Sequence, residues 1–192
     1  KEASGTEPIF TIKPYKKKKY AIVTTGSEVF KGRIKDTFSP VIREKLAAFP
    51  SEEIDQIYVD DEKTHILEAI QKQIAAGADL IICTGGMSVD PDDQTPGAIK
   101  QTGARIVSYG APVLPGAMFL LSYYDAGDRL VPICGLPGCA MYNKRTIFDI
   151  VLPRLMACDM ILADELAGLG EGGLCLNCDV CTFPNCGFGK GF

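Results

Sequence analysis

The sequence predicts an α/β fold: a three-layer α/β/α sandwich with a mainly parallel sheet, plus a short cysteine-rich tail. Two observations support this prediction. Short apolar runs rich in β-branched residues recur along the chain, and such runs are typical of strands buried on both faces. Segments with helical periodicity lie between them and end at glycine or proline. Alternating strands and helices favour right-handed crossovers between parallel strands, with helices on both faces of the sheet.

Five segments are predicted to be strands. Each is a short apolar run that ends at turn-forming or acidic residues. The first run stops at Gly26, and the second stops at Asp60 and Asp61. The complete set is residues 20–24, 54–59, 79–83, 105–109 and 129–134.

Two helix starts are marked by an N-cap residue followed by proline. Ser39 precedes Pro40, and Thr95 precedes Pro96. Proline is preorganised for the first helical position, and the serine or threonine side chain can cap the free amide groups. The predicted helices are residues 39–49, 63–76, 95–102, 115–124 and 138–156, the last with an interruption near Pro153.

Composition limits the classes of function. The chain has 192 residues, of which 46% are apolar and 23% charged, and this suits one compact domain with a small appendage. Its formal net charge of −4 argues against a nucleic-acid surface, which needs a basic face. No apolar run approaches the roughly 18 residues of a membrane span, and no signal-peptide pattern is present. We expect a cytoplasmic protein that binds small molecules, and neither nucleic acid nor a membrane.

Three regions are expected along the chain. Residues 1–18 are polar and lysine-rich, and are interpreted as a linker from an upstream domain because the chain starts at Lys1 rather than methionine. Residues 19–158 carry the alternating strand and helix pattern. Residues 159–192 form the cysteine-rich tail.

Four of the eight cysteines gather in that tail with the spacing C-x2-C-x2-C-x4-C. Four thiolates at short spacing suit tetrahedral zinc or an iron–sulfur cluster, and the spacing does not separate the two. A flexible tail of free thiols is the simpler alternative. The predicted metal ligands are Cys175, Cys178, Cys181 and Cys186.

The other cysteines fall into two kinds. Cys83 and Cys134 end apolar strands and are expected in the core, where free cysteine is common. Cys139 is expected at a helix N-terminus, where the pKa of a thiol tends to fall, so it is a candidate for ligand contact or reactivity.

Four loops follow predicted parallel strands and could carry chemistry. Ligands of open α/β sheets bind beyond the carboxyl ends of the strands. Glycines in these loops let a ligand approach the backbone amides, and the helix start at Thr95 adds partial positive charge. The loops are residues 25–36, 60–62, 84–97 and 135–138.

The loop TGGMSVDPDDQTPG, residues 84–97, joins a double glycine to Asp90, Asp92 and Asp93. Carboxylates repel phosphate unless a cation bridges them, and magnesium usually binds one or two carboxylates together with substrate phosphates. The loop therefore indicates a magnesium-dependent phosphate site. An ordinary connection is the alternative, because glycine and aspartate are common turn residues. The glycines of these loops do not form the dinucleotide pattern G-x-G-x-x-G.

Four motifs together resemble a known family. In order they are TTGSEVFKGRIKD, GADLIICTGGMSVDPDDQTPGAI, PGAMFL and GLPGCAMY. They are similar to the molybdopterin-binding domain shared by molybdopterin adenylyltransferase, molybdopterin molybdenumtransferase and the competence-damage protein family. The resemblance runs from about Tyr20 to about Leu155 and implies an α/β/α sandwich with a pocket for a pterin phosphate. We also expect a homo-oligomer, a dimer or a trimer.

The resemblance implies roles for individual residues. It implies Asp61 and Asp93 as the catalytic carboxylates and as ligands of magnesium. It implies molybdopterin binding by residues of three glycine loops: Gly26, Ser27, Glu28, Thr84, Gly85, Gly86, Ser88, Gly135, Pro137 and Gly138.

The activity that the resemblance implies is a transferase of molybdenum cofactor biosynthesis, acting on pterin and nucleotide by magnesium-assisted nucleotidyl transfer or by molybdate insertion. The chain has Cys139 and Ala140 after GLPG, where the molybdenumtransferases continue with Asn-Pro. Two alternatives stay open: a nucleotide hydrolase resembling the competence-damage branch, and a non-catalytic module that binds the cofactor.

Overall fold

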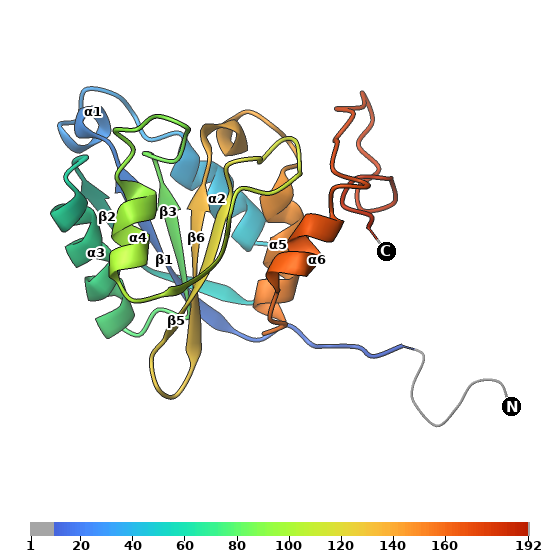
Figure 1. The fold of residues 1–192 in the computed structure, drawn as a ribbon, viewed down its shortest axis with the longest axis horizontal. Helices are drawn as coiled ribbons and strands as arrows, with labels where there is room; N and C mark the ends of the chain where they lie inside the picture. The colour runs from blue at the N-terminus through green and yellow to red at the C-terminus, as the bar shows by residue number, and fades with distance from the viewer. Residues whose placement is uncertain (1–9, 192) are drawn as a thin grey trace, which may run out of the picture.

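A single six-stranded sheet forms the centre of the molecule, with helices on both of its faces (Figure 1). The computed structural model describes residues 10–191. The strand order is β2-β1-β3-β6-β5-β4. The strands are β1 (Lys18–Thr25), β2 (Ser51–Val59), β3 (Leu80–Thr84), β4 (Arg105–Tyr109), β5 (Leu120–Asp125) and β6 (Leu130–Leu136). The α/β/α prediction is confirmed.

The helices divide between the two faces of the sheet. Helices α2 (Phe38–Leu46), α5 (Ile147–Met156) and α6 (Ala163–Gly168) pack in one apolar cluster, and α3 (Lys63–Ala75) and α4 (Thr95–Gln101) pack in the other. Alternate strand residues serve the two clusters: Ile22 lies in the first, and Ala21 and Val23 lie in the second. Two short helices, α1 (Ser27–Phe30) and the 3-10 helix η2 (Gly138–Met141), lie in loops. Among residues 10–191, no helix is long and apolar enough to span a membrane.

The sheet is mixed, with parallel pairing throughout one side. β1 pairs in parallel with β2 and β3, and β3 pairs in parallel with β6. β5 lies antiparallel to both β4 and β6. The prediction of a mainly parallel sheet therefore holds for the four strands that carry the glycine and acidic loops.

The prediction of a helix over residues 115–124 is wrong. Leu120–Asp125 is strand β5, and the residues before it form an irregular connection. Leu120, Leu121 and Ser122 are all buried, so this stretch shows no alternation of apolar and polar residues. A short run of that kind has no periodicity that separates a strand from a helix. Antiparallel pairing also removes the need for a crossover helix.

The long helix predicted over residues 138–156 is two helices. Its interruption lies before Thr146, whereas Pro153 sits inside α5. Thr146 starts α5 through a capping box: its hydroxyl accepts a hydrogen bond from Phe148 N, and Asp149 Oδ2 accepts one from Thr146 N at 2.8 Å. The other boundaries shift by only a few residues; α2, for example, begins at Phe38, with Thr37 at its N-cap.

Replacing Thr146 with alanine is expected to lower the free energy of unfolding by about 0.5–2 kcal/mol, because the buried cap of α5 is lost. Chemical denaturation followed by circular dichroism measures this change. Thr37→Ala is the matched control, since Thr37 also occupies an N-cap but its side chain makes no capping bond. Equal losses in the two variants would contradict the capping role of Thr146.

The tail packs into the first core cluster. Ile161, Leu166 and Phe188 are buried there. The backbone of the tail also pairs with the connection before β5: Leu114 N donates to Gly173 O at 2.6 Å, and Cys175 N donates to Leu114 O at 2.8 Å. Of the predicted linker, residues 1–9 lie outside the described residues.

Candidate functional site

The four loops selected from the sequence lie at one edge of the sheet. β2, β1, β3 and β6 are neighbours and run parallel, so their carboxyl ends meet at that edge. The loops after β1, β3 and β6 supply glycines, and the loop after β2 supplies Asp60 and Asp61. This is the position at which open α/β sheets bind ligands.

The turn after β3 is fixed by two threonine hydroxyls. Thr25 Oγ1 donates to Thr84 O at 2.6 Å, and Thr95 Oγ1 donates to Gly85 O at 2.8 Å. Gly85 has a φ of 82°, and a Cβ there would lie 2.1 Å from Thr25 O. The position therefore admits only glycine, because the end of β1 passes directly against it.

One buried hydroxyl of this turn has nothing to bond with. Thr84 is fully buried, and its Oγ1 has no hydrogen-bond partner among residues 10–191. Buried polar groups in folded proteins are normally paired with protein or water. The Thr84 hydroxyl is therefore left without a partner behind the glycine loop, at the carboxyl end of β3.

Asp90 and Asp93 of the same loop accept hydrogen bonds from other residues of that loop. Asp93 Oδ2 accepts hydrogen bonds from Ser88 N at 2.5 Å and Ser88 Oγ at 2.6 Å. Asp90 Oδ1 accepts one from Asp92 N at 3.0 Å, which makes Asp90 a turn residue. Tyr109 on β4 donates from its hydroxyl to Ser88 O at 2.9 Å. Burial raises the pKa of Tyr109, and the nearby Asp93 charge adds to that effect.

Asp61 holds the loop after β1. Its Oδ2 accepts a hydrogen bond from Ser27 N at 2.8 Å, and Gly26 N donates to Val59 O at 3.0 Å. Gly26 has a φ of 141°, and a Cβ there would meet no atom within 4 Å. The first loop is thus tied to the end of β2 while one side of Gly26 stays open.

Asp36 places a negatively charged carboxylate beside that loop. Burial by itself would raise the pKa of Asp36, but hydrogen bonds from Ser39, Gln56 Nε2 at 2.8 Å and Phe38 N at 2.9 Å outweigh it and hold the pKa below its usual value. A carboxylate with these donors stays ionised. Any anion bound nearby needs a cation to offset its repulsion.

Two cavities lie along this edge, one at either end of η2. The first-loop cavity, of about 390 Å³, is lined by Gly26, Ser27, Glu28, Asp36, Asp61 and Met141, among others. The glycine-loop cavity, of about 480 Å³, is lined by residues that include Met87, Ser88, Pro115, Met118, Pro137 and Gly138. Both volumes suit a small-molecule ligand.

The predicted site residues are divided between these cavities. Gly26, Ser27, Glu28 and Asp61 line the first-loop cavity, and Ser88, Pro137 and Gly138 line the glycine-loop cavity. The other predicted residues support the loops from behind and line neither cavity: Thr84, Gly85, Gly86, Asp93 and Gly135. Gly135 is needed for packing, because a Cβ there would lie 2.5 Å from the Met87 side chain.

Metal binding stays a prediction. In the part of the chain that the structure describes, no three His, Cys, Asp or Glu side chains are arranged to hold a metal ion. Asp61 contacts the first loop, whereas Asp93 contacts the glycine loop. Each keeps a second carboxylate oxygen, and magnesium usually binds through one or two carboxylates together with substrate oxygens.

Several residues that line these cavities were not predicted from the sequence to do so. Met141 and Tyr142 reach the first-loop cavity from η2, and Leu174 and Cys175 reach the glycine-loop cavity from the tail. Long-range packing brings them there. Cys139 lines the glycine-loop cavity as expected, but burial raises the pKa of its thiol, so the expected fall in pKa is wrong.

Cys83 and Cys134 lie in the core, as predicted. Both are fully buried, and burial raises the pKa of Cys83 to about 12 and raises that of Cys134 as well. Neither thiol is available for ionic chemistry at the loop edge.

Comparison with known proteins gives two relatives of defined activity. The chain is 28% identical over 131 residues to a molybdopterin adenylyltransferase from Pyrococcus furiosus, and the match covers 62% of this chain and 77% of that protein. It is 25% identical over 145 residues to a molybdopterin molybdenumtransferase from Synechococcus elongatus, covering 71% of this chain but only 36% of that protein.

The fold comparison agrees with the sequence comparison. The crystal structure of a tungsten cofactor synthesizing protein, MoaB from Pyrococcus furiosus, matches with a TM-score of 0.60 at 21% identity, covering 75% of this chain and 98% of that one. Residues 21–157, which include all four loops, match the family described as a probable molybdopterin binding domain. The chain therefore belongs to the molybdopterin-binding domain family.

Proposed function

We propose that this domain binds molybdopterin and transfers an adenylyl group to it from ATP during molybdenum cofactor biosynthesis. In this reaction a phosphate oxygen of molybdopterin attacks the α-phosphorus of ATP, and pyrophosphate leaves. The observation that carries the proposal is the pair of cavities on either side of η2, one rich in carboxylates and one largely apolar. A two-substrate transfer needs two such adjoining sites.

The glycine-loop cavity is suited to the pterin. Met87, Pro115 and Met118 give it apolar walls, and Ser88 adds a polar group at its rim. A flat heterocycle packs against walls of this kind while a few polar groups fix its orientation. The rigid turn at Gly85, with its free Thr84 hydroxyl, supports the loop from behind.

The first-loop cavity is suited to a nucleotide that brings a cation. Glu28, Asp36 and Asp61 line it against a single cation, Lys35, so a bare triphosphate would be repelled. Asp61 would hold magnesium here, and Asp93, which lines neither cavity, would reach the ion from the glycine loop as the second carboxylate. Bound magnesium would neutralise charge on the phosphates during transfer. Asp61 also orders the loop itself through its bond to Ser27 N.

Adenylyl transfer is favoured over molybdate insertion by the loop after β6. Cys139 lines the glycine-loop cavity and occupies the position after Gly138, where the molybdenumtransferases continue with asparagine.

The test is an assay with molybdopterin, ATP and magnesium, in which adenylylated pterin and pyrophosphate are both measured. Asp61→Asn and Asp93→Asn are expected to lower kcat/KM on the order of 100-fold, the usual loss when a group that stabilises transition-state charge is removed. Asp92→Asn is the matched control, because Asp92 is an exposed neighbour of Asp93 whose carboxylate makes no hydrogen bond among residues 10–191.

Other outcomes would replace the proposal. Release of nucleoside monophosphate without pterin would identify a nucleotide hydrolase. Pterin binding without turnover, measured by titration calorimetry, would identify a cofactor-binding module. Full activity in Asp93→Asn would remove Asp93 from the site and leave Asp61 alone.

A further inference from the structure

The four tail cysteines surround one cavity. It has a volume of about 290 Å³, and Cys175, Cys178, Cys181 and Cys186 all line it. The tail around them has no helix or strand, and its path is set by backbone contacts. Gly172 and Gly173 permit those contacts, since a Cβ on either would lie within 2.3 Å of a backbone oxygen. The fold thus brings the four thiols of a 12-residue segment to a common space.

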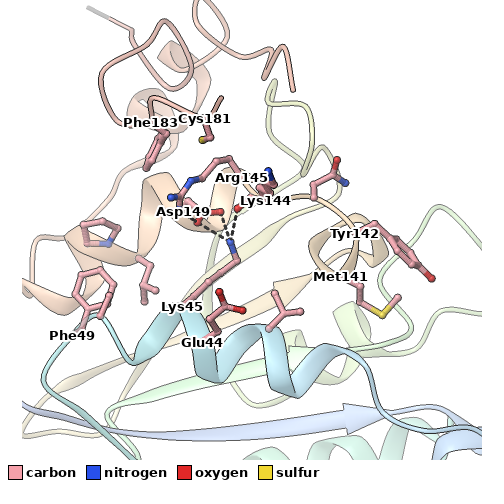
Figure 2. A pocket seen from close by; sticks show the side chains of 15 residues that line it. Glu44, Lys45, Phe49, Met141, Tyr142, Lys144, Arg145, Asp149, Cys181 and Phe183 are labelled. Carbon is pink, nitrogen blue, oxygen red and sulfur yellow. Dashed lines mark hydrogen bonds and ion pairs between the residues drawn. The ribbon is translucent and has the colours of Figure 1, made fainter. Parts of the chain in front are cut away.

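Positive charge from the domain faces the same cavity. Lys144 and Arg145 line it, ahead of helix α5. Figure 2 shows Cys181 and Phe183 of the tail beside Arg145. The Arg145 guanidinium lies 4.9 Å from the centre of the Phe183 ring. A negatively charged group held by four thiolates would therefore sit next to two cations and one carboxylate, that of Glu171.

Arg145 is held in place from the domain side. It donates to Asp149 Oδ1 at 3.0 Å, and Lys45 Nζ donates to the same carboxylate at 2.7 and 2.8 Å (Figure 2). Its Nε is buried and has no hydrogen-bond partner among residues 10–191. The guanidinium also interacts with the Cys181 sulfur, so Arg145 already contacts one of the four thiols from the domain side.

The arrangement of the thiols distinguishes between the two metal classes. Tetrahedral zinc with bonds of about 2.3 Å requires thiolates roughly 4 Å apart. No three cysteines among the described residues are gathered to hold a single ion, and the cavity that all four line, about 290 Å³, is far larger than one ion fills. In a four-iron cluster each thiolate binds a different iron, so the ligands stand around a larger body. We propose that Cys175, Cys178, Cys181 and Cys186 bind a [4Fe–4S] cluster in this cavity.

Cluster uptake is a ligand exchange. Each cysteine loses its thiol proton to solvent and forms one sulfur–iron bond. The cluster arrives assembled, from a donor that carries it on exchangeable thiolate ligands, so the protein exchanges no electrons. The four new bonds tie the tail segments to one another.

The proposed cluster borders the pterin cavity. Leu174 and Cys175 line both the cysteine cavity and the glycine-loop cavity. Cys175 N is bonded to Leu114 O, in the connection that forms the wall of the glycine-loop cavity. The role of the cluster as a neighbour of the pterin rests on the proposed function; its binding by the four cysteines does not.

The test uses the full chain, prepared without oxygen and incubated with iron, sulfide and a thiol reductant. We expect about four iron and four sulfide per chain, with visible absorbance that dithionite bleaches. Cys178→Ala is expected to lose most of the iron, and since Cys178 is exposed, its removal leaves the core intact. Cys158→Ala, which removes an exposed cysteine outside the tail, is expected to keep all of it.

Three results would overturn the proposal: one zinc per chain in place of iron, two irons per chain, or no metal with four tail thiols free to react with a thiol reagent. Equal iron in Cys178→Ala and Cys158→Ala would also do so. The assay contains neither pterin nor ATP, so its result is independent of the adenylyl transfer assay.

Discussion

Gly85→Ala is expected to lower the free energy of unfolding by about 2–6 kcal/mol and to abolish pterin binding. Two effects add. The φ of 82° is strained for any residue with a side chain, and the new Cβ would lie 2.1 Å from Thr25 O. That oxygen belongs to the backbone at the end of β1 and cannot move without disturbing the first loop. Denaturation followed by circular dichroism measures the first effect, and titration with molybdopterin measures the second.

Gly103→Ala separates the two effects. Gly103 has a nearly identical φ of 88°, but a Cβ there meets no atom within 4 Å. We expect this variant to lose only about 1–2 kcal/mol, the cost of the left-handed backbone, and to bind pterin normally. If the two variants lost the same stability, the close approach of Thr25 to Gly85 would be excluded.

Phe188→Ala is expected to lower the free energy of unfolding by about 3–5 kcal/mol, the usual cost of emptying a buried aromatic site. Phe188 is only 5% exposed and lies in the core cluster that α5 and α6 share. The loss shows that the tail is part of the folded core, so it should be measured by denaturation with all thiols reduced and no metal present.

Leu176→Ala is the control for that variant. Leu176 lies in the same tail but is 77% exposed, so its truncation should change stability by no more than about 0.5 kcal/mol. A loss below about 1 kcal/mol in Phe188→Ala would mean that the tail can detach while the rest of the domain stays folded.

The strands that carry the site could be predicted because their apolar residues indicate burial on both faces of the sheet. β1 and β3 each contain a buried apolar run and are each followed by glycine, so both their burial and their carboxyl ends can be identified in the sequence. The helices α3 and α4 follow from period and from the Thr95-Pro96 start. These are local signals, which depend on residues a few positions apart.

β5 and the break before α5 could not be predicted in the same way. β5 is a strand because β4 and β6 lie on either side of it, and a buried central strand carries no alternating pattern. The start of α5 depends on a capping box at Thr146. The break was predicted near Pro153 instead, because proline usually interrupts a helix.

The sequence by itself determined the α/β class, the sheet edge at which the site is proposed and the loops that face it. Only the tertiary structure decided how those loops divide into two cavities, that Asp61 and Asp93 contact different loops, and that four cysteines share a cavity walled by Arg145. The physical reason is one of range. Strand burial and helix periodicity depend on residues that are close in the sequence. A cavity forms from side chains and backbone that the fold brings together from distant parts of the chain.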